Sequence, residues 1–276
     1  MAATIASAQT IQFVFVTKQR EYTQTSTANP ALIANPYSVG ASIDGTALTS
    51  GYPISPTVAV QNGLVTTITL DPPSPDNWSF KSGGYAGQTS LNLDYGSGNY
   101  TYQSASFSNI ILNLSNADLY PNAPKATITT DTTLGFQWIG NVLEVNPGLF
   151  NTLTITSNTF AVNFSSSSNH IGIFGNNFTS NVGDESFNSA TPSLFVDIPA
   201  ATFLGGSANK SIGMEFNNLI DQISNIPTTG AQSISAFTSS TSFNIQVIPE
   251  PSTYAAILGA LALAGVMLRR RRRTAT

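Results

Sequence analysis

The stretch that decides the fold class is residues 57–70, which read Thr-Val-Ala-Val-Gln-Asn-Gly-Leu-Val-Thr-Thr-Ile-Thr-Leu. Two runs rich in β-branched residues, 57–61 and 64–70, flank the pair Asn62-Gly63. Asn and Gly both tolerate positive φ, which the tight turn between two hairpin strands requires. The stretch therefore predicts a β-hairpin that turns at Asn62-Gly63.

Short alternating runs of this kind recur along most of the chain. Residues 152–164 predict a second hairpin with its turn at Ser157-Asn158, and only residues 217–224 have a faintly helical pattern. Clusters of Gly, Pro, Asn and Ser separate the runs, which is typical of all-β proteins rather than of alternating β-α units. We expect an all-β body with a β-sandwich or jelly-roll-like fold. The other candidate strands are residues 10–17, 37–43, 89–94, 105–114, 125–130, 134–139, 170–174, 193–198, 211–216, 232–237 and 242–248.

The body is predicted to occupy residues 9–247. Sandwiches of about 200 to 250 residues commonly form one unit, so a single domain is preferred. The segment Pro121-Asn122-Ala123-Pro124 is the position at which two units could be divided, near 121–124.

Charged residues make up only 9% of the 276 residues, whereas a typical soluble domain has about 25%. Ser, Thr and Asn contribute 33, 33 and 25 residues, so hydroxyls and amides form most of the polar surface. There is no cysteine, which excludes disulfides, thiolate zinc sites and thiol catalysis, and the single histidine, His170, excludes sites with two imidazoles. No cofactor or metal is expected.

The charge is distributed unevenly along the chain. Residues 1–250 hold five basic and all fourteen acidic residues, a net charge of −9, and five arginines follow near the C-terminus. An acidic body without a basic stripe cannot neutralise phosphates, so nucleic-acid binding is not expected.

The C-terminal segment has three parts in a fixed order. Pro249-Glu250-Pro251 comes first, then an uncharged run at residues 254–268, and then Arg269, Arg270, Arg271, Arg272 and Arg273. As a helix, the fifteen uncharged residues span roughly 22 Å, less than the roughly 30 Å hydrocarbon core. The preceding Ser-Thr extends the predicted transmembrane helix to 252–268, and arginines directly after it should stay cytoplasmic, with the body outside.

This order of parts resembles the PEP-CTERM sorting signal, over residues 248–273. The resemblance implies that an exosortase-type membrane protease of Gram-negative, exopolysaccharide-producing bacteria recognises Pro249, Glu250 and Pro251. It also implies removal of the helix and arginines and delivery of the body to the cell surface or extracellular matrix. The alternative is a plain membrane anchor that is never trimmed, in which the arginines only fix topology.

Export also requires a signal peptide with a basic start and an apolar stretch. Residues 1–8 lack both, but Ala6-Ser7-Ala8 fits the small-x-small cleavage rule. Residues 1–8 are therefore interpreted as a possible remnant of a longer signal peptide, with chance occurrence as the alternative.

The body has no catalytic motif, and we expect a non-enzymatic exported protein. Ser207 and Lys210 have a Ser-x-x-Lys spacing without companion motifs, and Asp184-Glu185 reads best as a solvated loop. The alternative is an envelope protein that binds or degrades polysaccharide. Degradation needs two facing carboxylates, for which Glu144, Asp197 and Glu215 are candidates.

Binding needs exposed aromatic platforms. The candidates are Trp78, Trp138, Tyr95, Tyr100 and Tyr102, whereas Phe13 and Phe15 are expected in the core because they lie in an alternating strand. Six Asn-x-Ser/Thr sequons occur, about the number that this composition produces by chance, at Asn77, Asn99, Asn113, Asn163, Asn177 and Asn209.

Overall fold

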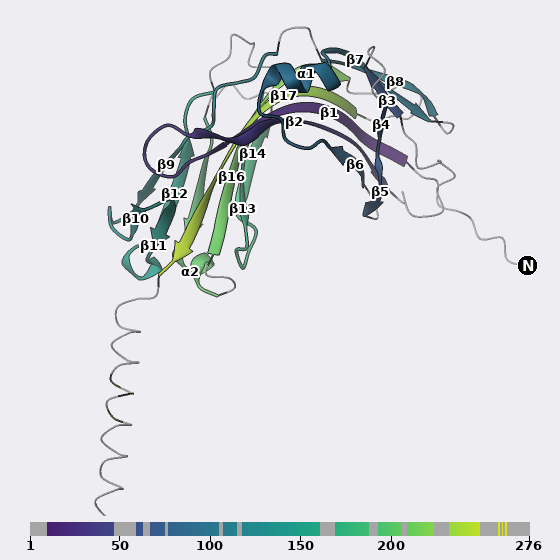
Figure 1. Ribbon diagram of the computed structural model, residues 1–276. Helices are drawn as coiled ribbons and strands as arrows, with labels where there is room; N and C mark the ends of the chain where they lie inside the picture. Colours follow the sequence, from purple (N-terminus) through teal and green to yellow (C-terminus); the bar gives the residue numbers. More distant parts are fainter. Residues whose placement is uncertain are drawn as a thin grey trace, which may run out of the picture.

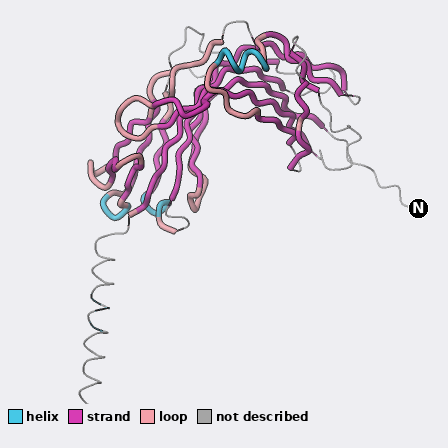
Figure 2. Tube along the Cα trace, in the orientation of Figure 1, coloured by secondary structure: helices cyan, strands magenta, loops and turns pink. Residues whose placement is uncertain are grey.

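The structure, a computed structural model, is dominated by strands that form an arch (Figures 1 and 2). It describes residues 10–46, 59–62, 67–74, 77–104, 107–114, 118–160, 169–187, 193–205, 209–223 and 232–248, with Gly259, Leu261 and Leu263. The all-β prediction for the body is confirmed.

A ten-stranded sheet runs through the whole arch. Eight of its strands follow one another in the order β14 (Gly183–Phe187), β13 (Asn169–Asn176), β16 (Asn209–Ile223), β17 (Gln232–Val247), β1 (Thr10–Thr23), β2 (Ala31–Thr46), β6 (Asn77–Lys81) and β5 (Asp71–Ser74). The hairpin of β10 (Phe136–Ile139) and β11 (Val142–Val145) joins this sheet because β11 pairs in parallel with β17. Strands β1 and β17 also pair in parallel, and the other neighbours pair antiparallel.

Two smaller sheets cover opposite halves of the long sheet (Figure 1). The first contains β4 (Thr67–Thr69), β3 (Ala59–Asn62), β7 (Gly98–Ser104) and β8 (Phe107–Leu114); the second contains β15 (Phe195–Pro199), β12 (Thr152–Ser157) and β9 (Ala126–Thr130). We call the half under the first sheet the first lobe and the half under the second sheet the second lobe. Each lobe is thus a sandwich, as the alternation of apolar and polar residues predicts.

Each lobe has its own buried core. The first includes Val14, Val16, Tyr100, Tyr102 and Leu91, the last on helix α1 (Gln88–Asp94). The second includes Leu143, Leu153, Ile155 and Ile173 and is bordered by the short helices η1 (Pro147–Leu149) and α2 (Ala200–Phe203). Strand β17 contributes Phe237 to the first core and Phe243 and Ile245 to the second. One strand therefore connects both cores.

The segment at 121–124 carries the chain from the first covering sheet to the second. The backbone oxygen of Pro121 accepts hydrogen bonds from Arg20 Nη2 at 2.8 Å and from Ser239 Oγ at 2.6 Å. Nearby, Asn218 Nδ2 donates to the oxygen of Leu119 at 3.0 Å. The crossing segment is thus fixed to β1, β16 and β17, which run beneath it.

The strand pair of the first predicted hairpin is confirmed but its turn is longer, and the second predicted hairpin is wrong. Strands β3 and β4 pair with Gln61 opposite Thr67, so the connection is longer than the two residues Asn62-Gly63. Strand β12 pairs with β9 and β15 instead of with residues 159–164, of which 161–164 lie outside the described residues. At β12 the long-range pairing of sheets, rather than local turn chemistry, determines the strand partners.

Two further assignments change type. Residues 89–94, predicted as a strand, form α1, in which Leu91 is buried against the first core and Tyr95 N donates to its oxygen at 2.7 Å. Residues 217–223, with their helical pattern, are instead the end of β16, where β17 supplies ladder hydrogen bonds up to Ile223. Tertiary pairing therefore overrides weak local preference in both segments.

Within the described residues, no helix is long and apolar enough to cross a membrane. The predicted transmembrane helix at 252–268 lies outside them apart from Gly259, Leu261 and Leu263, which are helical. The predicted signal-peptide remnant at 1–8 also lies outside the described residues.

Candidate functional site

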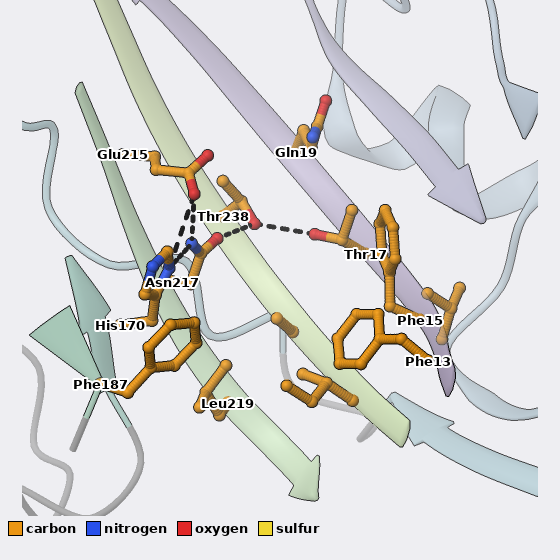
Figure 3. A pocket seen from close by; sticks show the side chains of 13 residues that line it. Phe13, Phe15, Thr17, Gln19, His170, Phe187, Glu215, Asn217, Leu219 and Thr238 are labelled. Atoms are coloured by element: carbon orange, nitrogen blue, oxygen red, sulfur yellow. Dashed lines mark hydrogen bonds and ion pairs between the residues drawn. The ribbon is translucent and has the colours of Figure 1, made fainter. Parts of the chain in front are cut away.

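A groove of about 250 Å³ lies on the open face of the long sheet, the face opposite the two cores (Figure 3). It crosses β14, β13, β16, β17 and β1. One part is apolar and is lined by Phe13, Phe15, Leu219, Ile234 and Ala236. The other part is polar and is lined by Thr17, Gln19, His170, Glu215, Asn217 and Thr238. The groove can therefore contact both faces of an amphipathic ligand.

Strand register aligns the polar side chains of the groove. Phe187, His170, Asn217, Thr238 and Gln19 occupy directly paired positions on five adjacent strands. Side chains at paired positions point to the same face of a sheet, and those one residue away point to the other. Alternation thus sends the adjacent residues in each strand, among them Phe216 and Phe237, to the core side.

A chain of hydrogen bonds connects this row. Asn217 Nδ2 donates to Glu215 Oε1 at 3.0 Å and lies 2.6 Å from His170 Nδ1. An ionised carboxylate only accepts, so Glu215 fixes the orientation of the Asn217 amide. The amide oxygen then accepts from Thr238 Oγ1, and Thr17 Oγ1, at 2.8 Å, donates to Thr238. Each donor in this chain of hydrogen bonds therefore points from β1 towards β13.

His170 is buried between two carboxylates. Its Nε2 lies 3.3 Å from Glu185 Oε2, and its Nδ1 lies 3.5 Å from Glu215 Oε1. The ring of Phe187 stacks on the imidazole with 4.0 Å between ring centroids. Because Asn217 donates to Nδ1, the proton of a neutral imidazole is on Nε2, where Glu185 accepts it. Among the described residues that line the groove, the two hydroxyls, of Thr17 and Thr238, donate to a hydroxyl and to an amide oxygen rather than to His170.

A second polar cluster is buried inside the first lobe, beneath α1. The fully buried Lys18 Nζ donates to Asn92 Oδ1 at 2.6 Å, Ser97 Oγ at 3.2 Å and Asp118 Oδ1 at 3.4 Å. Gln88 and Asn92 also donate to Asp118. Burial lowers the pKa of Lys18. Burial raises the pKa of Asp118, but the bonds from Asn92 and Gln88 and the Lys18 ammonium together bring it below its ordinary value. This cluster holds α1 on β1.

The carboxylates proposed from sequence do not form a facing pair. Glu144 lies on β11 beside Gln137, Asp197 lies on β15 and accepts from Thr154 Oγ1 at 2.6 Å, and Glu215 lies in the groove. Asp184 and Glu185 form part of β14 rather than a solvated loop, and Glu185 faces His170. The four side chains around His170 come from β14 and β16, so their proximity was not visible in the sequence.

Most of the predicted aromatic platforms are unsuitable. Trp78, Tyr100 and Tyr102 are buried in the first core, and Trp138 packs edge-to-face on Phe243. Tyr95 is half-buried and packs against Phe80 and Tyr85. Phe13 and Phe15, expected in the core, instead line the groove.

The Ser-x-x-Lys spacing is not visible as a pair in the structure. Lys210 is buried and donates to the backbone oxygens of Asn177 and Gly205, while Ser207 lies outside the described residues.

The body ends where the C-terminal motif begins. Val247, the last residue of β17, pairs with Val145, and Ile248 N donates to the Val145 oxygen at 2.9 Å. Pro249, the next residue after Ile248 in the sequence, has no amide hydrogen to donate to a ladder. Pro249, Glu250, Pro251 and the arginines Arg269–Arg273 lie outside the described residues.

Comparisons with known proteins identify one feature of the chain. The ligand-binding domain of human OSCAR is similar to 81% of this chain over 97% of its own length, at 10% sequence identity and a TM-score of 0.22, which is too low to support an argument. No curated protein matches. The family model of the PEP-CTERM protein-sorting motif matches residues 247–273. The chain therefore carries a PEP-CTERM protein-sorting motif at its C-terminal end, which supports export and processing by an exosortase-type partner.

Proposed function

We propose that this protein is an exported cell-surface or extracellular-matrix protein whose non-enzymatic body is released by an exosortase. The supporting observation is the motif match at residues 247–273, which begins at the final residue of β17. In this proposal the helix at 252–268 holds a membrane intermediate with the arginines in the cytoplasm and the body outside. Cleavage near Pro249-Glu250-Pro251 then removes the anchor.

The chemistry of the motif suits a protease that works at a membrane. Pro249 and Pro251 lack amide hydrogens and bias their neighbours toward extended backbone. Glu250 lies between them in the sequence, so in this proposal its carboxylate is presented on a short extended segment. An extended segment with an exposed carboxylate is the form that a protease active site can bind.

The test is a Glu250→Ala variant expressed in the native host. We expect the precursor to accumulate in the membrane and the surface fraction to lose the body. Glu144→Ala is a matched control, because Glu144 is a partly exposed carboxylate on β11, near the same end of the body. Mass spectrometry of the mature protein gives the second readout. Recovery of peptides from residues 254–276 at the surface would favour the permanent anchor instead.

A second candidate function is polysaccharide binding in the groove. It is favoured by the rings of Phe13, Phe15 and Phe187 beside the hydrogen-bonding groups of Glu215 and Asn217. The test is a pull-down with polysaccharide purified from the producing organism. Phe187→Ala should weaken binding, whereas Phe195→Ala, an exposed phenylalanine on β15, should not. Turnover of the polysaccharide that is abolished by Glu215→Gln would indicate an enzyme.

A further inference from the structure

Three exposed leucines gather at the end of the second lobe from which the C-terminal motif leaves. Leu134 lies in the turn before β10, Leu149 is the last residue of η1, and Leu204 follows α2. Their exposed fractions are 61%, 48% and 60%. Figure 1 shows β10, β11, α2 and the end of β17 together at this end of the arch. We call these three residues the leucine end.

Local packing holds the leucine end beside Ile248. Leu134, Leu149 and Ile248 line one hollow of about 290 Å³. Thr132 Oγ1 donates to the oxygen of Leu149 at 2.7 Å, which ties the turn to η1. Phe150 and Phe203 pack edge-to-face with 6.0 Å between centroids, which ties η1 to α2. The three leucines are therefore presented by loops that are fixed to one another.

The chain length after Ile248 sets how far this end can be from a membrane. Only Pro249, Glu250 and Pro251 separate Ile248 from the predicted span that starts at Ser252. At about 3.6 Å per fully extended residue, Ser252 lies within roughly 14 Å of Ile248. The headgroup layer of one leaflet is itself roughly 5–7 Å thick. The end of the body that surrounds Ile248 must therefore come close to the headgroups.

We propose that the leucine end is a lipid-docking surface that seats the body on the outer face of the bilayer before processing. The proposal rests on the membrane intermediate of the proposed function. The contact is apolar rather than ionic. The side chains of Asp131 and Glu144 near this end are acidic, so they do not attract anionic headgroups. The nearby Lys210 ammonium is bound by the carbonyl oxygens of Asn177 and Gly205. Seating on the bilayer keeps Pro249-Glu250-Pro251 at a constant height for a membrane protease.

The absence of cysteine from the sequence makes single-site labelling unambiguous. Leu134→Cys and Leu204→Cys, made in the full chain, are labelled with an environment-sensitive fluorophore and reconstituted into phosphatidylcholine vesicles that contain a headgroup-level lipid quencher. Leu93→Cys is the matched control, because Leu93 is an exposed leucine on α1 at the top of the arch. We expect several-fold stronger lipid quenching at positions 134 and 204 than at position 93. High salt should leave the difference unchanged.

Flotation of the vesicles separates the possible failures. If the chain floats with vesicles but all three labels are quenched equally weakly, the docking surface is refuted while the anchor stands. If quenching disappears in high salt, the contact is ionic and the proposal is also refuted. If the full chain does not float, the membrane intermediate of the proposed function fails, and the docking surface fails with it.

Discussion

The two lobes share β16 and β17 but are stabilised by different chemistry. The first core encloses the Lys18–Asp118 cluster and the hydroxyl groups of Tyr100 and Tyr102. The buried cluster of the second lobe is built from Leu, Ile, Val, Met, Phe and Ala side chains, and the polar residues buried near it, among them Asn146, Thr202 and Lys210, are not carboxylates. Apolar burial does not depend on proton binding, whereas a buried carboxylate does. Acid should therefore weaken the first lobe before the apolar core of the second.

The largest expected effect is in the second lobe. Phe243→Ala removes a buried ring of β17 that packs edge-to-face on Trp138. The cost should be about 3–5 kcal/mol of unfolding free energy, since it combines lost burial and a cavity. Urea unfolding should give the same loss at neutral and at mildly acidic pH. A loss that shrinks in acid would contradict the expectation that it comes from apolar burial alone.

Asp118→Asn should have the next largest effect, in the first lobe. It leaves the buried Lys18 ammonium without a counter-charge and should cost about 3 kcal/mol at neutral pH. The folded pKa of Asp118 lies below its ordinary value of 3.8. Its stabilising contribution is therefore complete above that value and is lost as pH falls through the folded pKa.

Acid titration tests this difference directly. The stability of the wild-type protein should fall between about pH 5 and pH 2 by more than that of Asp118→Asn. Asp197→Asn is the control, because Asp197 is exposed on β15 and has Thr154 as a hydrogen-bond partner. Parallel acid curves for the wild type and Asp118→Asn would show that the cluster does not control acid sensitivity.

The two lobes and the groove were predictable from sequence to different extents. Alternation in residues 10–17 correctly predicts a strand, but a period of two does not say which face is inward. Val14 and Val16 enter the core, and the larger Phe13 and Phe15 line the groove.

The parallel pairing of β1 with β17 joins residues more than 200 positions apart, such as Thr17 and Thr238. No local pattern encodes this pairing, and the His170 site depends on similar long-range register. The sorting motif was predictable because all its parts are contiguous.

Tyr102→Phe should have a smaller effect in the first lobe. The buried Tyr102 hydroxyl donates to the backbone oxygen of Phe15, and burial raises the pKa of the phenol well above its usual value. Without the hydroxyl, that oxygen loses a partner in a buried setting, at a cost of about 1–2 kcal/mol. Chemical denaturation measures the loss. Tyr95→Phe is the comparison, because Tyr95 is only half-buried, and an equal loss there would remove the special role of Tyr102.

The smallest stability effect is expected at the groove, where β17 passes between the two cores. Thr238→Val keeps the side-chain shape but removes the donor to Asn217 Oδ1, which should cost about 1 kcal/mol. Thr129→Val, at an exposed position of β9, is the control for the change of residue type. Urea unfolding of both variants at one fixed pH measures the difference.

The same variant has a more sensitive readout than stability. The chain has a single histidine, so ¹⁵N-histidine labelling gives one pair of ring signals that belong to His170. The hydrogen-bond row predicts that the neutral ring of the wild type carries its proton on Nε2, because Asn217 donates to Nδ1. Thr238→Val frees the Asn217 amide to turn, and the population with the proton on Nδ1, facing Glu215, should increase. An Nδ1-protonated ring already present in the wild type would show that the row runs in the opposite direction. At the other end of the row, the Thr17 hydroxyl would then donate to a molecule bound in the groove, whereas in the structure it can only accept from one.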